Sequence, residues 1–438
     1  MAQVVGWLVM LVALAISIGV HELGHMLPAK AFGVRVPRYM IGFGPTVWST
    51  RRGETEYGIK AIPLGGYTKL TGMLPPTDAV GARPGTSAIG RLVQAAREAS
   101  AEEILPGEDH RAFYRLSVPK RLVVMAGGIF ANLLLAFLVL ASVILTAGLS
   151  LGAVSTTVGQ VGACVYPADA SAEFECSDAD PVGPAAAAGL EVGDVLVSFD
   201  GQPIEEWTDF TQAVRASSGV GIPLVVERAG TNVTLTVDPI ETERPVFTED
   251  GEIELDDDGE PVTAMTRYVG VSPGYVTHDS IESVVPVTWE VVTSTADIVV
   301  HLPQRLADIG RVLVGEEQRS ADGVIGLVGL GQVSGAIAAG GDGVTFGEQV
   351  AAWLTVLASL NVALFVFNLI PLVPLDGGHV AGALWDGTKR LWARLRGLPR
   401  PRPADTARMV PVAYGVFLLL IGMTIFLAVA DIVRPVTG

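Results

Sequence analysis

The stretch VVGWLVMLVALAISIGVHELGH, residues 4–25, decides how this chain is organised. Its first 17 residues carry no charge, and it ends in the motif His21-Glu22-Leu23-Gly24-His25. Two histidines four residues apart lie on one face of a helix, one turn from each other. Their imidazoles can bind one zinc ion, and the glutamate between them can act as a general base toward water. The motif therefore predicts a zinc site inside a membrane or at its edge.

The alternative interpretation, that the His-Glu-x-x-His motif is a coincidence, fits this position poorly. Ionisable residues beside a hydrocarbon span are costly and mark functional sites by default. A catalytic zinc ion usually takes three protein ligands and leaves one position for water. The histidine pair supplies two ligands, so we expect one zinc ion per chain and a third ligand elsewhere in the sequence.

The composition of the 438 residues is that of a membrane protein. Half of the residues are hydrophobic and 17% are charged, against roughly 25% charged residues in typical soluble proteins. The net charge of −17, without a basic patch, argues against nucleic acid as a partner. The first apolar run lacks the basic start and cleavage site of a secretory signal, so we expect it to be retained. Four apolar runs are long enough to span a bilayer, at about residues 4–20, 122–149, 353–372 and 410–432.

The distribution of charge predicts the orientation of these spans. Residues 26–121 carry 14 Lys/Arg and 8 Asp/Glu, and residues 377–408 carry 7 Lys/Arg and 2 Asp/Glu. Residues 146–350 have the opposite balance, with 7 Lys/Arg and 33 Asp/Glu. Because basic residues near span ends stay in the cytoplasm, we expect both basic loops inside the cell. Both termini and the acidic middle segment are then extracytoplasmic. Spans one and three run in the same direction and bring His21 and Asp376 to a similar depth near the cytoplasmic side.

Asp376, in Leu375-Asp376-Gly377-Gly378, is the expected third zinc ligand. A carboxylate at the membrane edge needs a partner, and the histidine pair lies at the same expected depth. The alternative is a simple turn residue, since Asp-Gly is a common turn pair. The match in depth favours a ligand.

Four features together resemble the site-2 proteases, a family of intramembrane zinc metalloproteases. The resemblance covers nearly the whole chain, and it is greatest to the actinobacterial enzymes with four spans and one PDZ domain. The features are the His-Glu-x-x-His motif on span one, Asn368-Leu-Ile-Pro371-Leu-Val-Pro374-Leu-Asp376-Gly377-Gly378 at the end of span three, the glycine-rich pieces Gly42-Phe43-Gly44 and Pro63-Leu64-Gly65-Gly66-Tyr67, and a PDZ-like segment between the central spans.

The resemblance implies a role for each matching residue. His21, His25 and Asp376 would bind zinc, and Glu22 would be the general base. Asn368 would hold the extended backbone of the substrate, because a side-chain amide both donates and accepts hydrogen bonds. The alternative for Asn368 is a hydrogen bond between membrane helices.

The glycine-rich piece Gly42-Phe43-Gly44 and the alternating residues 56–60 are expected to form short strands. In the family such strands make a re-entrant sheet beside the active site, and an unpaired edge there could bind substrate as an added strand. An ordinary cytoplasmic hairpin is the alternative.

One departure from the family concerns the start of span two. The family often shows Ala-Gly-Pro-x-x-x-Asn, where this chain has Ala126-Gly127-Gly128-Ile129-Phe130-Ala131-Asn132. Asn132 is kept and is expected to support the site, while Gly128 stands in place of proline. We expect this departure to affect local packing without touching a zinc ligand.

The predicted fold is a polytopic α-helical membrane protein with four transmembrane helices, a re-entrant β element and an inserted α+β PDZ domain. The PDZ core is expected to contain helices at 184–190 and 209–216, a strand within 193–201 and a hairpin of 223–228 with 232–237. Peptide binding and steric exclusion of large ectodomains are the two alternatives for its role. The expected domains are a first membrane half at 1–150, the PDZ-like domain at 151–245, an acidic linker with membrane-surface helices at 246–350, and a second membrane half at 351–438.

Several smaller features complete the sequence-based prediction. Cys164 and Cys176, the only cysteines, both fall on the expected outer side, where they form either one disulfide or two free thiols. Residues 249–260 are expected to be a solvated acidic loop. Residues 285–302 suit an amphipathic helix on the outer membrane surface, and residues 87–103 suit a mixed-charge helix in a cytoplasmic insertion.

These observations lead to one hypothesis and one rival. The hypothesis is a zinc metalloendopeptidase of the plasma membrane that cuts transmembrane segments of single-pass membrane proteins. The resemblance implies substrates such as anti-sigma factors that an upstream site-1 protease has already cut outside the cell. The rival is a membrane-tethered PDZ scaffold with a structural metal site, but the open coordination position and Glu22 argue against it.

Overall fold

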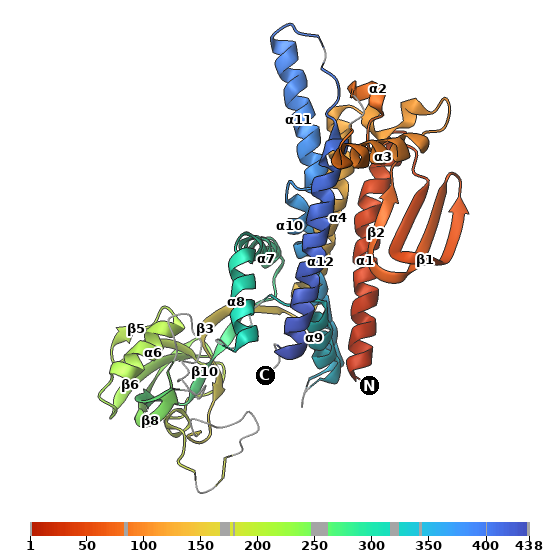
Figure 1. The fold of residues 1–438 in the computed structure, drawn as a ribbon. Coiled ribbons are helices and arrows are strands. Elements are labelled where there is room, and N and C mark those ends of the chain that lie inside the picture. The colour runs from red at the N-terminus through yellow and green to blue at the C-terminus, as the bar shows by residue number, and fades with distance from the viewer. Residues whose placement is uncertain are drawn as a thin grey trace. The chain divides into compact units, whose positions relative to one another are not determined.

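The computed structural model describes residues 2–82, 86–166, 176–177, 180–246, 262–315, 324–340, 344–399 and 401–435. The chain divides into two compact units (Figure 1). Unit 1 combines Met1–Ala147 with Ser280–Gly438, and unit 2 is Gly148–Asp279. The finer division into four domains stays a proposal, and the predicted acidic loop at 249–260 lies outside the described residues.

Unit 1 is built around long apolar helices. Five described helices are long and apolar enough to cross a membrane, and four of them overlap the predicted spans, two of which extend three residues beyond their helix. The fifth, at 281–300, is the least apolar and overlaps the predicted membrane-surface helix. The structure thus fits a multi-pass membrane protein, and the count of four spans stays a proposal. The five helices are α1 (Ala2–Ala31), α4 (Val118–Thr146), α7 (Val284–Val300, with the preceding turn), α10 (Phe346–Leu369) and α12 (Val410–Val433, with the preceding turn).

Buried polar contacts fix the helices of this bundle against one another. Asn361 of α10 donates a hydrogen bond of 2.8 Å to the hydroxyl of Ser17 on α1, and both side chains are fully buried. The carboxylate of Asp431 on α12 accepts hydrogen bonds from the backbone N–H groups of Gly326 and Gly329, at the start of α9 (Leu327–Ala339). Asp431 therefore caps α9, whose first N–H groups have no partner within the helix. The start of α1 and the end of α12 lie at the same end of the bundle (Figure 1).

A sheet of two long strands, β1 (Arg38–Arg52) and β2 (Thr55–Lys69), follows α1. Both strands fold back on themselves, so Tyr39 pairs with Tyr57 on one side and with Thr68 on the other. Residues 46–52 form one outer edge, paired only on the side of residues 55–60. The pairing confirms strands at 42–44 and 56–60, but the strands are far longer than the sequence indicated.

One ion pair joins the segment between β2 and α4 to the loop before α12, and a second joins α4 to α11 (Asp376–Leu395). Helix α3 (Ala88–Glu102) of this segment confirms the helix predicted at 87–103. Arg97 of α3 is buried and contacts Asp405 at 2.7 Å. Arg121 at the start of α4 contacts Asp386 at 2.9 Å, and both are buried. The remaining elements of unit 1 are α2 (Thr77–Val80), η1 (Asp109–Arg111), η2 (Phe113–Arg115), η3 (Ile281–Ser283), α8 (Leu302–Val314) and η4 (Thr406–Met409).

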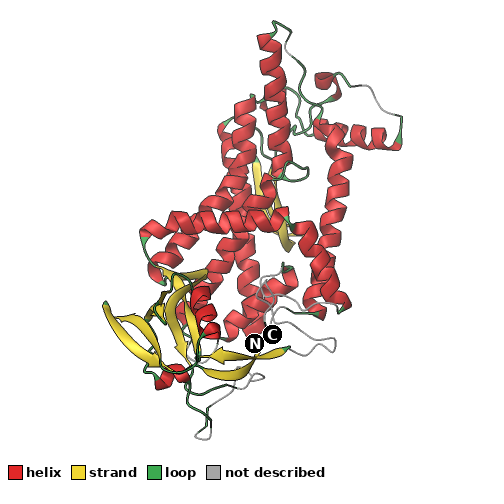
Figure 2. Ribbon diagram, turned by 90° about the vertical axis from the view of Figure 1, so that its left-hand side faces the viewer, coloured by secondary structure: helices red, strands yellow, loops and turns green. Residues whose placement is uncertain are grey.

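Unit 2 is an α+β unit whose strands are yellow in Figure 2. Its main sheet has the order β10-β3-β4-β6-β7, with β5 beside β4, and β8 pairs separately with β9. The predicted hairpin is present as β6 and β7, and the predicted helices as α5 and α6. The elements are β3 (Leu149–Val161), α5 (Pro184–Ala187), β4 (Val195–Phe199), β5 (Gln202–Pro203), α6 (Trp207–Ala216), β6 (Ile222–Arg228), β7 (Thr231–Val237), β8 (Ile240–Pro245), β9 (Thr263–Tyr268) and β10 (Val271–His278).

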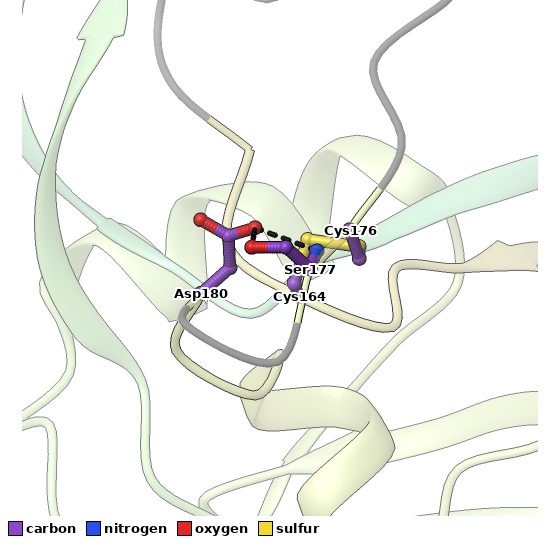
Figure 3. Close-up of a disulfide and its surroundings, with 4 residues drawn as sticks. All are labelled: Cys164, Cys176, Ser177 and Asp180. Carbon is purple, nitrogen blue, oxygen red and sulfur yellow. Dashed lines mark hydrogen bonds between the residues drawn. A yellow bond between two sulfur atoms is a disulfide. The ribbon is translucent and has the colours of Figure 1, made fainter.

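A buried carboxylate and a disulfide stabilise unit 2. Asp194 is 1% exposed and receives two hydrogen bonds of 2.7 Å from the guanidinium of Arg228. These bonds hold the pKa of the Asp194 carboxyl below its ordinary value, against the opposing effect of burial. Cys164 and Cys176 are joined in a disulfide (Figure 3). The PDZ assignment itself stays a proposal.

Candidate metal centre

The histidine motif lies where α1 and α4 approach each other most closely. A Cβ atom on Gly24 would lie 2.4 Å from the carbonyl oxygen of Gly127, and one on Gly127 would lie 2.2 Å from that of Gly24. Small residues let membrane helices pack this closely. The contact brings residues of α4 within reach of both histidines.

His25 occupies a space that α4 leaves open. Its Nδ1 lies 2.8 Å from the carbonyl oxygen of Val124 and donates a hydrogen bond to it, which leaves the Nε2 lone pair free for a metal. A Cβ atom at Gly128 would lie 2.2 Å from this Nε2. The expectation that the Gly128 departure touches no proposed ligand is therefore wrong. The missing side chain at this position makes room for the imidazole ring.

Asp376 reaches the same point from the other half of unit 1. The predicted third span extends to residue 372, but α10 ends at Leu369 because Pro371 disfavours helical backbone at the residue before it. Asp376 begins the next helix, α11. A Cβ on Gly377 would lie 2.3 Å from the carbonyl oxygen of Ile370, so only glycine permits the tight turn between the two helices.

His21, His25 and Asp376 form the single group of three or more metal-binding side chains found among the described residues. Nε2 of His21 and Nε2 of His25 are 3.2 Å apart, and they lie 3.1 and 3.2 Å from Oδ2 of Asp376. Zinc bonds of about 2.0–2.1 Å in a tetrahedron place neighbouring ligand atoms roughly 3.3–3.4 Å apart. Two imidazoles and one carboxylate are also a donor set that zinc prefers. The three side chains therefore fit a zinc ion with one position left for another ligand.

The side chain of Asn132 on α4 lies beside Nδ1 of His21, the ring nitrogen that does not face Asp376. Its fully buried amide nitrogen is 3.3 Å from Nδ1 of His21, while its amide oxygen has no hydrogen-bond partner. Nδ1 must carry a proton when Nε2 binds a metal. Exchanging the amide oxygen and nitrogen, which have nearly the same shape, lets the oxygen accept that proton and satisfies both groups.

Glu22 lies between helix α1 and the sheet. It is 9% exposed, and no hydrogen bond or ion pair joins its carboxylate to another residue that the structure describes. Thr68 of β2 donates a 3.0 Å hydrogen bond to the Glu22 carbonyl oxygen. A Cβ on Gly66 would lie 3.2 Å from Cγ of Glu22, so glycine at 66 lets the strand pack against the acid. An unpaired carboxylate beside the three ligands can accept a proton.

Among the described residues, no hydrogen bond or ion pair joins the other predicted site residues to this group. Asn368 donates to the carbonyl oxygen of Leu364 within its own helix, which is neither the substrate contact nor the interhelical bond expected. Phe43 lies in β1 opposite Ile62 and is 47% exposed. Gly42 and Gly44 flank it with φ of +91° and +83°, backbone that other residues rarely adopt. Their roles toward substrate stay proposals.

Comparison with known proteins identifies the family. The model of peptidase family M50 matches residues 9–397. The chain belongs to peptidase family M50. This membership confirms the predicted resemblance to the site-2 proteases and the assignment as a zinc metalloprotease. Together with the long apolar helices, it indicates a multi-pass membrane protein.

Relatives within the M50 family match over most of their length. The chain is 33% identical to zinc metalloprotease Rip1 of Mycobacterium tuberculosis, across 100% of this chain and 99% of that protein. It is 30% identical to metalloprotease MmpA of Caulobacter vibrioides, across 86% of each chain. It is 26% identical to the regulator of sigma-E protease RseP of Escherichia coli, across 84% of this chain and 88% of that protein.

Proposed function

We propose that this protein is an intramembrane zinc metalloendopeptidase that cuts the transmembrane segments of single-pass membrane proteins. The observation that carries the proposal is the split group of His21, His25 and Asp376. Its members come from the last third of one long apolar helix and from the start of the helix that follows another, which supports a site near the border of the membrane domain.

Four residues of the chain would have separate roles in peptide hydrolysis. His21, His25 and Asp376 would hold the zinc ion, which supplies a Lewis acid that polarises a peptide carbonyl and acidifies water. Glu22, whose carboxylate is free of partners among the described residues, would accept a proton from the attacking water. It would then deliver that proton to the leaving amide nitrogen, which must be protonated to depart.

The sheet beside Glu22 would present the substrate. A peptide bond inside a helix is hydrogen-bonded and must be unwound before attack, and its freed N–H and C=O groups need new partners in a membrane. A strand edge supplies such partners. We assign this task to β1 and β2 around Gly42-Phe43-Gly44, and to the Asn368 amide in a conformation released from Leu364.

We further propose the orientation that the charges favour, with both termini and the PDZ-like unit 2 outside the cell and the site near the cytoplasmic side. Suitable substrates are single-pass proteins already trimmed outside by a site-1 protease, anti-sigma factors among them. The name of the RseP relative, a regulator of sigma-E protease, supports this substrate class.

A comparison of membrane proteomes tests the proposed function. Cells that carry Glu22→Ala in place of the wild-type protein should accumulate trimmed single-pass segments that wild-type cells clear. Quantitative mass spectrometry of membrane peptides measures this. Identical membrane proteomes in the two strains would remove the support for an intramembrane protease and favour the scaffold alternative.

Asn132 should tune the metal site through His21. We expect Asn132→Ala to lower the zinc affinity by about 10–100-fold, because the outer partner of a metal-bound histidine fixes its tautomer and ring orientation. Asn132→Asp should keep the affinity near the wild-type value, since a carboxylate also accepts the Nδ1 proton. Competition with a zinc chelator measures both variants. Wild-type zinc affinity in Asn132→Ala would contradict this role. Equal losses of zinc affinity in both variants would show that Asn132 acts only through packing.

A further inference from the structure

A second buried carboxylate lies on the helix that Asp376 begins. Asp386 is 1% exposed and lies ten residues further along α11, about 15 Å away at 1.5 Å per residue. Its Oδ2 accepts a hydrogen bond of 2.9 Å from Arg121 of α4. Its Oδ1 accepts a bond of 2.7 Å from the backbone N–H of Ala404 and lies 3.0 Å from Nζ of Lys389. Burial acts to raise the pKa of Asp386, but the bonds from Lys389 and Arg121 outweigh it and hold the pKa below its ordinary value.

Helix α11 packs mainly on α4, and the Arg121–Asp386 ion pair lies in this contact. The residue after Asp386 is a glycine, and a Cβ atom there would lie 3.2 Å from Cγ1 of Val118 at the start of α4. The opposite face of α11 is exposed, with Leu384 at 53% and Trp385 at 62%. The position of α11 therefore depends on its contact with α4.

The zinc ligands come from two halves of the chain, so contacts between these halves determine their spacing. Along α1 and α10, the hydrogen bond from Asn361 to Ser17 precedes the ligands in sequence. The Arg121–Asp386 pair joins α4 to α11 on the other side of the ligand group, since Asp386 follows Asp376 along α11. The ligand group is thus enclosed by two buried polar contacts between the halves.

Arg121 is also connected to a histidine ligand through α4. It lies three residues before Val124, whose carbonyl oxygen accepts the hydrogen bond from Nδ1 of His25. The ion pair therefore links the segment of α4 that orients His25 to the helix that carries Asp376. A shift between these two segments would change the distance of 3.2 Å between Nε2 of His25 and Oδ2 of Asp376.

We propose that Asp386 is a positioning residue for the zinc site. Through its ion pair with Arg121 it holds α11 against α4, and this keeps the Asp376 carboxylate where it can bind the same metal ion as His21 and His25. The role depends on the zinc site proposed above, and Asp386 acts in it through Asp376.

The zinc affinity of the full-length protein in detergent tests this role, with chelator competition as the measurement. An asparagine amide has one accepting atom where the carboxylate has two, so Asp386→Asn loses an acceptor for Arg121 or for Ala404. Asp386→Asn and Arg121→Gln should each lower the zinc affinity at least tenfold. This is the lower end of the loss typical when a residue that orients a metal ligand is changed.

The double variant, with Asp386→Asn and Arg121→Gln together, should show a loss of similar size. Both changes remove the same contact, so their effects should not add. The double variant also leaves neither partner of the pair charged, which avoids an uncompensated buried charge. It therefore decides the question if a single variant does not fold.

Arg97→Gln is the matched control. Arg97 and Arg121 are both buried and each is paired with an aspartate, but the partner of Arg97 lies in the loop before α12. The control change leaves the pair between α4 and α11 in place, so its zinc affinity should stay within about twofold of the wild-type value. The visible absorption of cobalt(II) bound in place of zinc reports the ligand geometry. It should change in Arg121→Gln and stay unchanged in Arg97→Gln.

Wild-type zinc affinity in the double variant would overturn the positioning role. Equal losses in Arg97→Gln and Arg121→Gln would overturn it too, because the ion pair would then serve only the stability of the fold. Asp376→Asn separates these results from a failure of the proposed zinc site. If Asp376→Asn loses zinc while the double variant keeps it, only the positioning role is wrong. If both bind zinc like the wild-type protein, the proposed zinc site is wrong as well.

Discussion

Glu22→Gln is expected to abolish proteolysis while leaving the metal centre intact. Glutamine has the shape of glutamate but cannot accept a proton, and a general base commonly contributes about 10²–10⁴-fold to the rate. No hydrogen bond joins the Glu22 carboxylate to another described residue, so no donor of another residue loses its acceptor on substitution. Purified protein should therefore keep one zinc ion per chain by metal analysis. Cleavage of a reconstituted single-pass substrate should fall by at least 100-fold, the lower end of that range.

The matched control for this experiment is Glu102→Gln, the same change at an exposed position of α3. It should cleave like the wild-type protein. If Glu22→Gln retains zinc and cleaves within threefold of the wild-type rate, Glu22 is not the base. A fall in zinc content together with activity would show instead that Glu22 maintains the site.

Asp376→Asn should remove zinc and activity together. The substitution replaces the carboxylate, 3.1 Å from Nε2 of His21 and 3.2 Å from Nε2 of His25, by a neutral amide that is a poor zinc ligand. Changes to residues that only orient a ligand already cost about 10–100-fold in affinity, so the loss of a ligand should exceed that range. Chelator competition measures the affinity, and substrate cleavage is followed on the same preparation.

The control here is Asp78→Asn, an exposed acid of α2, which should leave zinc binding unchanged. Added zinc should restore part of the activity of Asp376→Asn, because two histidine ligands remain. If the variant binds zinc with wild-type affinity, Asp376 is not a ligand. The proposed site then has no ligand from the second half of the chain.

The ligand group could be predicted from the sequence because two regularities apply to it. Helical periodicity places His21 and His25 on one face, and the length and direction of the spans place Asp376 at their depth. In the structure, the possible ligand atoms of the three side chains all lie within 4.8 Å of one another. Residue type alone does not distinguish Asp376 from the other acidic residues as a zinc ligand. The expected depth in the membrane is what singles it out.

Other parts of the site depend on contacts that the sequence pattern does not contain. Gly24 and Gly127 meet because two particular helices cross there, and Gly128 makes room for the ring of a residue 103 positions earlier in the chain. The fold-back of β1 and β2 also escaped prediction, because their side chains do not alternate cleanly between buried and exposed. Helix α9 was missed because it has 13 residues, too few for a span.

The order in which the protein is synthesised limits when the site can exist. His21, Glu22 and His25 enter the membrane with the first helix, but Asp376 follows only after all of unit 2 and α10 have been made. During that interval the nascent chain carries the proposed base and two of the proposed ligands without the third. The interhelical bond from Asn361 to Ser17 also has to wait until α10 has been made. If His21, His25 and Asp376 form the zinc site, the chain therefore cannot cleave other proteins before α10 and the residues after it have been made.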